Sequence, residues 1–185
     1  MPVDYLRAKY DAVFRLLNET YGRPVWRSHG APLDELVGTI LSQATADINT
    51  ERAFAALTAR FPDWESVMNA PPEVVIAAIR SAGLANMKGP RIQAALRHIY
   101  SERGELSLDF LADLPLDEAM AWLTNLDGVG PKTASIVLLF SLGRPAFPVD
   151  THVHRVTGRL GLLPPRMNAE RAHAFLAALG NPETY

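Results

Sequence analysis

A short glycine-rich turn constrains the fold of this chain more than any other segment. Residues 126–134 read LDGVGPKTA, and apolar residues spaced by three and four positions precede them from Leu116 to Leu126. That spacing is typical of one face of a helix. Pro131 suits the first position of a second helix, because proline has no backbone N–H to leave unpaired there. The segment therefore predicts two helices joined by a tight hairpin, over about residues 117–142.

The predicted hairpin is suited to bind an anion. We expect Gly128 and Gly130 to take positive φ angles and to expose their backbone amides, since glycine tolerates that conformation. With the free N–H groups of the second helix, these amides would bind a phosphate without a positive side chain. A nucleotide-binding P-loop is excluded, because the spacing GxxxxGK[ST] is absent and a helix precedes the turn instead of a strand.

Lys132 is an unusual residue for the first turn of a helix. A cation at this position opposes the helix dipole, which favours the neutral amine. Burial and positive surroundings would favour that neutral form further and so make the amine a nucleophile. The alternative is an ordinary lysine that contacts phosphate, and a short glycine pattern alone would favour it.

Asp150 follows Lys132 by eighteen positions in the sequence. It precedes a segment predicted to be helical from Thr151 to Leu160, so one interpretation is a helix N-cap. A second interpretation is a carboxylate held ionised near Lys132, able to accept a proton or to stabilise positive charge on a sugar. The two roles are compatible, because a capping carboxylate is rigid and stays charged.

These residues lead to a resemblance that covers roughly residues 30–180. The segment LDGVGPKTASIVLLFSLGRPAFPVDTHVHRVTGR, residues 126–159, resembles the DNA glycosylases of the endonuclease III type in the helix–hairpin–helix (HhH-GPD) superfamily, which share LPGVGxKTA…VDTHV.R. LSQATAD at residues 41–47 is similar to their LSxQxTD segment, and residues 79–84 with Lys88 are similar to their I…GL…K segment. The resemblance implies an all-α fold of two lobes that binds DNA across the cleft between them.

The resemblance also implies an activity in base excision repair, that of a bifunctional DNA glycosylase with abasic-site lyase activity on oxidised pyrimidines. The lysine matching Lys132 would attack C1′ of a flipped-out nucleotide, form a Schiff base and cut the strand by β-elimination, with help from the aspartate matching Asp150. A base must leave the duplex stack before its glycosidic bond can be reached. Two alternatives stay open: a related glycosylase with another base preference (mismatch or photoproduct), and a non-catalytic DNA-binding module. We expect a monomer that binds damaged double-stranded DNA.

Other residues are expected to contact DNA. Gln43 is a candidate for the residue that fills the gap left by the flipped base, although it stands one place before the family's glutamine and Ala44 has the aligned position. The alternative is a glutamine on a helix surface. The formal net charge of −2 argues against a protein that coats DNA electrostatically. The full set of expected DNA contacts is Gln43, Gly128, Val129, Gly130, Lys132, Thr133, His152 and Arg155.

No metal site is expected from the side chains of this sequence. The chain has no cysteine, so its residues cannot ligate an iron–sulfur cluster, which needs thiolates. Many members of the resembled family continue into a segment C-x6-C-x2-C-x5-C that binds a [4Fe–4S] cluster, so a cluster would require such a C-terminal segment to be missing here. His152 and His154 point to different sides of a helix, which disfavours zinc. The resemblance implies that backbone carbonyls around Leu126 to Val129 can hold a monovalent cation.

Composition and periodicity indicate a globular, all-α chain. Hydrophobic residues make up 48% of the sequence, and no apolar run approaches the ~18 residues of a membrane-spanning helix. Without a signal-peptide pattern, we expect a soluble cytoplasmic protein that does not bind membranes and, in a bacterium, associates with the nucleoid. By resemblance, residues 25–144 form a six-helix lobe with the hairpin, and residues 1–24 plus 145–185 form a second helical lobe, C-terminally incomplete. Predicted helices cover Val3–Glu19, Pro32–Ala46, Asn49–Arg60, 63–69, 72–82, Lys88–Glu102, 107–113, 151–160 and 168–179, besides the two of the hairpin.

Overall fold

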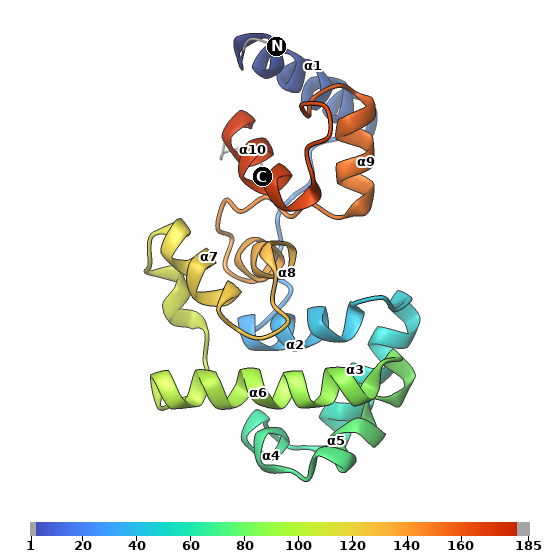
Figure 1. Ribbon diagram of the computed structural model, residues 1–185, viewed down its shortest axis with the longest axis vertical. Helices are drawn as coiled ribbons and strands as arrows, with labels where there is room; N and C mark the ends of the chain where they lie inside the picture. The colour runs from blue at the N-terminus through green and yellow to red at the C-terminus, as the bar shows by residue number, and fades with distance from the viewer. Residues whose placement is uncertain (1–2, 181–185) are drawn as a thin grey trace.

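The computed structural model describes residues 3–180, and all of the regular structure in that range is helical. Two lobes follow one another along the long axis of the molecule (Figure 1), with α2 to α8 in the larger lobe and α1, α9 and α10 in the smaller lobe. The all-α, two-lobed fold expected from the sequence is therefore confirmed. The elements are α1 (Val3–Tyr21), α2 (Pro32–Ser42), α3 (Asp47–Arg60), α4 (Trp64–Asn69), α5 (Pro72–Ala78), η1 (Arg80–Ala82), α6 (Ala85–Arg103), η2 (Asp109–Ala112), α7 (Leu116–Thr124), α8 (Pro131–Ile136), η3 (Val137–Ser141), α9 (Thr151–Arg159) and α10 (Ala169–Leu179).

The larger lobe is built around the apolar faces of α2 and α6. Pro32 begins α2 at its first position, as its missing N–H allows. α6 approaches α5 closely at Gly89, where an added Cβ would lie 2.9 Å from Cγ1 of Ile76. The space between these helices is filled by side chains that are almost wholly withdrawn from solvent, among them Leu36, Ile40, Leu41, Ile79, Ile92, Leu96 and Ile99.

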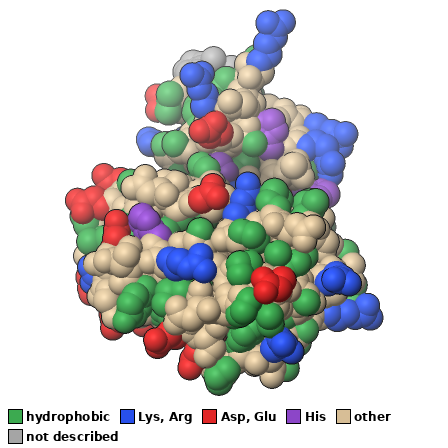
Figure 2. Space-filling view, turned by 60° about the horizontal axis from the view of Figure 1, so that its bottom comes forward, with side chains coloured by type: hydrophobic (Ala, Val, Ile, Leu, Met, Phe, Trp, Pro, Cys, Tyr) green, Lys and Arg blue, Asp and Glu red, His purple; other side chains and the backbone are tan. Residues whose placement is uncertain are grey.

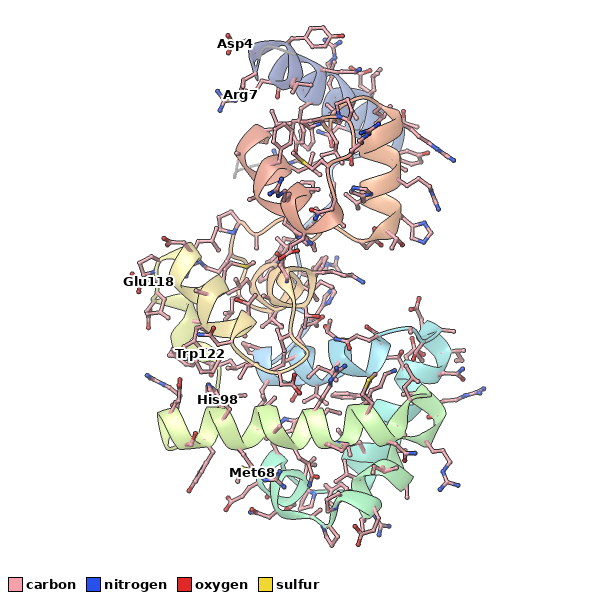
Figure 3. The ribbon with its side chains drawn as sticks, viewed as in Figure 1. Asp4, Arg7, Met68, His98, Glu118 and Trp122 are labelled. Atoms are coloured by element: carbon pink, nitrogen blue, oxygen red, sulfur yellow. The ribbon has the colours of Figure 1, made fainter. Side chains whose placement is uncertain are left out.

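α7 is held against α6 by an aromatic contact. Trp122 lies over the C-terminal half of α6 (Figure 3), with its ring centroid 6.0 Å from that of His98. Its indole Nε1 donates a hydrogen bond to Oε2 of Glu102 over 2.8 Å. Because α7 runs directly into the glycine turn, this packing fixes where the turn begins.

The smaller lobe has a hydrophobic cluster of its own. Leu6 of α1 meets Val149 and residues of α10 such as Leu176, and all three are buried. Ala146, by contrast, packs with the cluster of the larger lobe. The division of the chain at residues 25 and 144 stays a prediction, and residues 181–185 lie outside the described part of the chain. No helix within residues 3–180 is long and apolar enough to cross a membrane.

Several helix ends differ from those that periodicity predicts. α2 ends at Ser42 and not at Ala46, because Ala44 takes a left-handed φ of 53° and the carbonyl of Leu41 is bonded to a distant lysine. Residues 72–82 break at Ile79 into α5 and η1. α6 begins at Ala85, three residues earlier than predicted. The helix after the glycine turn continues from Val137 to Ser141 with π-helical hydrogen bonding.

Candidate functional site

The hairpin between α7 and α8 takes the predicted tight form. Gly128 has a φ of +75°, and the amide of Val129 donates to the carbonyl of Leu126 over 3.1 Å. The prediction for Gly130 is wrong, because its φ is −93°. Gly130 is the N-cap of α8, a position that needs extended backbone, and its carbonyl accepts the first helical hydrogen bond, from Ala134.

Lys132 is exposed in the first turn of α8, so burial is not among the features that act on its amine. Its neighbours Val129 and Thr133 turn their side chains into the larger lobe, where each is about 5% exposed. Only the backbone of these two residues is therefore presented to a ligand at the hairpin. The amine of Lys132 is the cationic group that the hairpin offers to solvent.

Asp150 is the N-cap of α9, as one of its two interpretations predicted. Its Oδ1 accepts a hydrogen bond from the amide of Val153 over 2.7 Å, and the residue is half-buried. This contact holds the carboxylate in a fixed direction. The second interpretation, proton transfer near Lys132, stays a prediction.

A buried histidine lies between the hairpin and Asp150. Nδ1 of His173 is 3.2 Å from the amide nitrogen of Val149 and 3.0 Å from the carbonyl oxygen of Phe147, so it holds the backbone just before Asp150. Burial lowers the pKa of His173, the contact with the Phe147 carbonyl raises it in part, and the charge of Lys132 lowers it again. Lys132 is thus within electrostatic reach of the segment that carries Asp150.

Gln43 lies just beyond the end of α2 and contacts the hairpin. Its side-chain Nε2 donates to the carbonyl oxygen of Gly128 over 3.1 Å, although 85 positions separate the two residues. The alternative of a glutamine on a helix surface is wrong, because the helix has ended at Ser42. The structure therefore joins two segments that were expected to contact DNA.

Arg91 of α6 lies against the hairpin within the larger lobe, although the sequence suggested only a basic residue on the lobe that faces the hairpin. A Cβ on Gly128 would lie 2.8 Å from Cδ and 2.9 Å from Nε of Arg91, so the side chain passes directly over the turn. Nε of Arg91 is 4.0 Å from Oδ2 of Asp127, and the side chain is 30% exposed. An arginine is thereby placed beside the amides that are suited to bind phosphate.

A cavity of about 620 Å³ opens beside α8, the helix that carries Lys132 in its first turn. Ile136 and Phe140 contribute to its wall, four and eight positions after Lys132, so they continue along the same side of this helix. Thr39 of α2 lies on another wall. The ring of His29 stacks on Phe140, with centroids 4.6 Å apart and planes 7° from parallel. The lining also includes the carboxylates of Asp34, Glu35 and Glu51, and the size is that of a site for a small ligand.

His152 and Arg155 are both exposed on α9 and contact each other, with Nδ1 of the histidine 2.9 Å from a guanidinium nitrogen. His154 instead turns toward the carbonyl of Met167, 2.8 Å from its Nε2. The two histidines therefore point apart, as predicted. Figure 2 shows basic, histidine and acidic side chains on both lobes, with several acidic side chains at the left margin of the lower lobe.

The described residues do not fit a metal cluster. Within residues 3–180 no three His, Cys, Asp or Glu side chains form a group that could hold a metal ion. The sequence has no cysteine, so none of its residues supplies the thiolates of a [4Fe–4S] cluster. At the hairpin, the carbonyl of Leu126 accepts from Val129 and that of Gly128 accepts from Gln43. A monovalent cation there stays a prediction.

Several sequences named as DNA glycosylases or as endonuclease III are similar to this chain over much of its length. A protein of Arabidopsis thaliana, provisionally named a DNA glycosylase, is 41% identical over 160 residues, which are 86% of this chain and 52% of that protein. Endonuclease III of Thermotoga maritima is 36% identical over 144 residues, 78% of this chain and 63% of the relative. The DNA glycosylase/AP lyase ROS1 of Arabidopsis thaliana is 36% identical over 102 residues, 55% of this chain and 7% of ROS1. The chain thus spans about half the length of the first of these relatives.

Solved structures and a family model agree with these sequences. A non-covalent complex of endonuclease III with DNA superposes with a TM-score of 0.78 at 25% identity, covering 96% of this chain and 79% of that one. A trapped covalent intermediate of endonuclease III with DNA superposes with a TM-score of 0.74 at 26% identity, covering 99% of this chain and 80% of that one. The model of the HhH-GPD superfamily base excision DNA repair proteins matches residues 37–182. The chain belongs to this superfamily.

Proposed function

We propose that this chain is a bifunctional enzyme of base excision repair, a DNA glycosylase with abasic-site lyase activity. One observation carries the proposal. Lys132 is exposed at the start of α8, and its charge acts on His173, which bonds to the backbone just before Asp150. Lys132 of the larger lobe and Asp150 of the smaller lobe thus both lie near one buried histidine. The proposed partner is a damaged DNA duplex, bound by one copy of the chain.

The names of similar proteins support both halves of this activity. The relatives include an endonuclease III and a protein named as a DNA glycosylase/AP lyase. One of the similar structures holds a trapped covalent intermediate between endonuclease III and DNA. The proposed chemistry of Lys132 would form a covalent intermediate in this chain as well.

In the proposed reaction, the lone pair on Nζ of Lys132 bonds to C1′ as the glycosidic bond breaks and the base leaves with the electron pair. Asp150 accepts the proton that the amine must lose and stabilises positive charge on the sugar. Opening of the sugar ring gives a Schiff base. Loss of a proton from C2′ then expels the 3′ phosphate by β-elimination and cuts the strand.

We propose oxidised pyrimidines as the preferred bases. The cavity beside Ile136 and Phe140 is large enough for a single ring, and Ile136 belongs to α8, the helix that carries Lys132. A base can enter it only after leaving the stack. Excision from duplexes carrying thymine glycol, 8-oxoguanine or a G·T mismatch would compare the preferences directly. Faster release of thymine glycol supports the proposal, whereas faster release of either other base would make this a related glycosylase of different preference.

The covalent step is tested by borohydride trapping on a duplex with one abasic site. The sequence has three lysines, and they differ in exposure: Lys88 is fully buried, Lys9 is half-buried on α1, and Lys132 is exposed. We expect a covalent protein–DNA adduct in the wild type that disappears in Lys132→Gln. Lys9→Gln is the matched control and should form the adduct normally.

Two results would contradict the proposal. An adduct that persists undiminished in Lys132→Gln would place the nucleophile elsewhere. A wild-type protein that binds the duplex but forms no adduct would be a monofunctional glycosylase or a binding module. Retained DNA binding in Lys132→Gln, measured by anisotropy, separates lost chemistry from lost affinity.

A further inference from the structure

Lys88 is a fully buried lysine with no acidic partner. Its side chain is 0% exposed, and Nζ lies among three neutral oxygens: the carbonyl of Leu41 at 2.7 Å, Oγ1 of Thr45 at 2.7 Å and the carbonyl of Ala82 at 2.8 Å. An ammonium has three N–H donors, so each of them is used. Burial lowers the pKa of Lys88, and a buried charge without a counterion is costly. Because burying this ammonium costs free energy, we expect Lys88 to have a structural role besides filling space in the core.

Two of the three acceptors belong to the end of α2 and the turn after it, whose Gln43 contacts the hairpin. Leu41 is in the last turn of α2, where carbonyls lack helical partners. Thr45 is in the turn between α2 and α3, and Ala82 ends η1. The ammonium therefore fastens the α2–α3 turn, residues 43–46, to the segment that leads into α6.

The hydrogen bonds continue from Lys88 to Gln43. Oγ1 of Thr45 accepts from Lys88 and can donate its own proton to the carbonyl of Gln43, 3.1 Å away, or to that of Ala82. Within this turn Ala44 has a φ of +53°, a conformation that a residue with a side chain rarely adopts without support. The hydrogen bonds of Lys88 therefore stabilise the conformation of the turn, and Gln43 of the same turn donates to the Gly128 carbonyl.

We propose that Lys88 is a positioning residue, which acts through Thr45 to hold Gln43 against the Gly128 carbonyl and so keeps the hairpin in the shape that binds damaged DNA. This inference rests on the proposed function, because it assumes that the hairpin face binds DNA. Lys88 itself touches no DNA, being enclosed by protein. Its effect on DNA binding must therefore pass through Gln43.

The test uses Thr45, whose substitution is milder than loss of a buried charge. Thr45→Val removes the hydroxyl and keeps the shape, while Thr45→Ser keeps the hydroxyl. Binding is measured on a duplex with a tetrahydrofuran abasic analogue opposite 2-aminopurine, whose fluorescence reports displacement of the opposite base. We expect Thr45→Val to bind about tenfold more weakly, the effect of losing one charged hydrogen bond, and to give a smaller fluorescence change. Thr45→Ser should behave as the wild type.

A double-mutant cycle with Gln43→Ala separates positioning from general stability. If Lys88 and Thr45 act through Gln43, Thr45→Val should weaken binding no further once Gln43 is alanine. The inference would be overturned if the double variant lost affinity for DNA by the product of the two single-variant factors. It would also be overturned if Thr45→Val bound DNA as tightly as the wild type. Circular dichroism at the assay temperature corrects each dissociation constant for the folded fraction.

This assay is independent of the proposed chemistry. A tetrahydrofuran site has no aldehyde and forms no Schiff base, so Lys132 makes no covalent contribution to it. If the wild type does not distinguish this duplex from an undamaged one, recognition of damaged DNA fails, and the positioning role fails with it. If it binds selectively but forms no borohydride adduct on a true abasic site, only the proposed chemistry fails.

Discussion

Gln43 and Gly128 are joined by a hydrogen bond of 3.1 Å from the side-chain amide of the first to the backbone carbonyl of the second. The contact connects the turn after α2 with the hairpin before α8, and it places both beside Arg91 of α6. Three helices of the larger lobe thus meet at one small surface. Substitutions at this surface, and at the junction with α9 and α10, should have separable effects on stability and on DNA binding.

Gly128→Ala should destabilise the protein, because the left-handed φ of +75° disfavours a side chain and the new Cβ would lie 2.8 Å from Cδ of Arg91. We expect a loss of about 1–3 kcal/mol in the free energy of unfolding, measured in urea. Gly130→Ala is the matched control, since its φ is −93° and a Cβ added there would meet no other segment within 4 Å. Equal losses in the two variants would show that the left-handed conformation is not what makes Gly128 necessary.

The structural role of Asp150 as an N-cap and its proposed role in strand cleavage should be separable by two substitutions. Asp150→Asn keeps a good N-cap for α9, so stability should change little, whereas Asp150→Ala should cost about 1 kcal/mol. Strand cleavage should be slow in both variants, because neither retains a carboxylate. Thermal unfolding and single-turnover cleavage of an abasic duplex measure the two effects. Normal cleavage by Asp150→Asn would remove the carboxylate from the mechanism.

His173 should make stability depend on pH below its ordinary pKa of 6.5, because its pKa in the folded protein is lowered, chiefly by burial. The unfolded chain binds more protons between the two values, so the free energy of unfolding falls as the pH drops from 6.5 through the folded pKa. His173→Asn should lose this part of the pH dependence. Urea unfolding of both proteins across that range is the measurement. Parallel curves would show that His173 does not titrate differently on folding.

Arg91 should contribute one contact with a DNA phosphate. The logarithm of the binding constant falls linearly with the logarithm of salt concentration, and Arg91→Gln should reduce that slope by about 0.9. Arg60→Gln, an exposed arginine in the last turn of α3, is the control and should leave the slope unchanged. An unaltered slope in Arg91→Gln would mean that Asp127 holds the guanidinium away from DNA.

Local chemistry made the hairpin predictable. A helical repeat, a pair of glycines and a proline at the first helical position are short-range signals, and they placed α7, the turn and α8 correctly. The same signals misjudged Gly130, because two glycines in one turn do not reveal which has a positive φ. Asp150 was predicted as an N-cap from its position immediately before a helical pattern, and its bond to Val153 confirms that interpretation.

Contacts between distant segments were beyond the reach of these patterns. The end of α2 was predicted too late, since the carbonyl that ends it is bonded to Lys88, 47 positions away. Arg91 and His173 were not among the predicted site residues, because helical spacing does not reveal which helix another will meet. The exposure of Lys132 likewise depends on how α8 packs against its neighbours and not on its place in the motif.

Both crossings between the lobes are fastened to the larger lobe by side chains. The indole of Trp26 donates to the carbonyl of Leu139, and the guanidinium of Arg144 donates to three carbonyls, those of Leu111, Ala112 and Leu114. Both anchors hold their crossing to the larger lobe. In the second crossing His173 of α10 holds Phe147 and Val149, whereas Ala146 packs with the larger lobe, so we expect any rotation between the lobes to bend this crossing between Ala146 and Phe147. Asp150 would then travel with α9, while Lys132 and Gln43 stay fixed relative to each other.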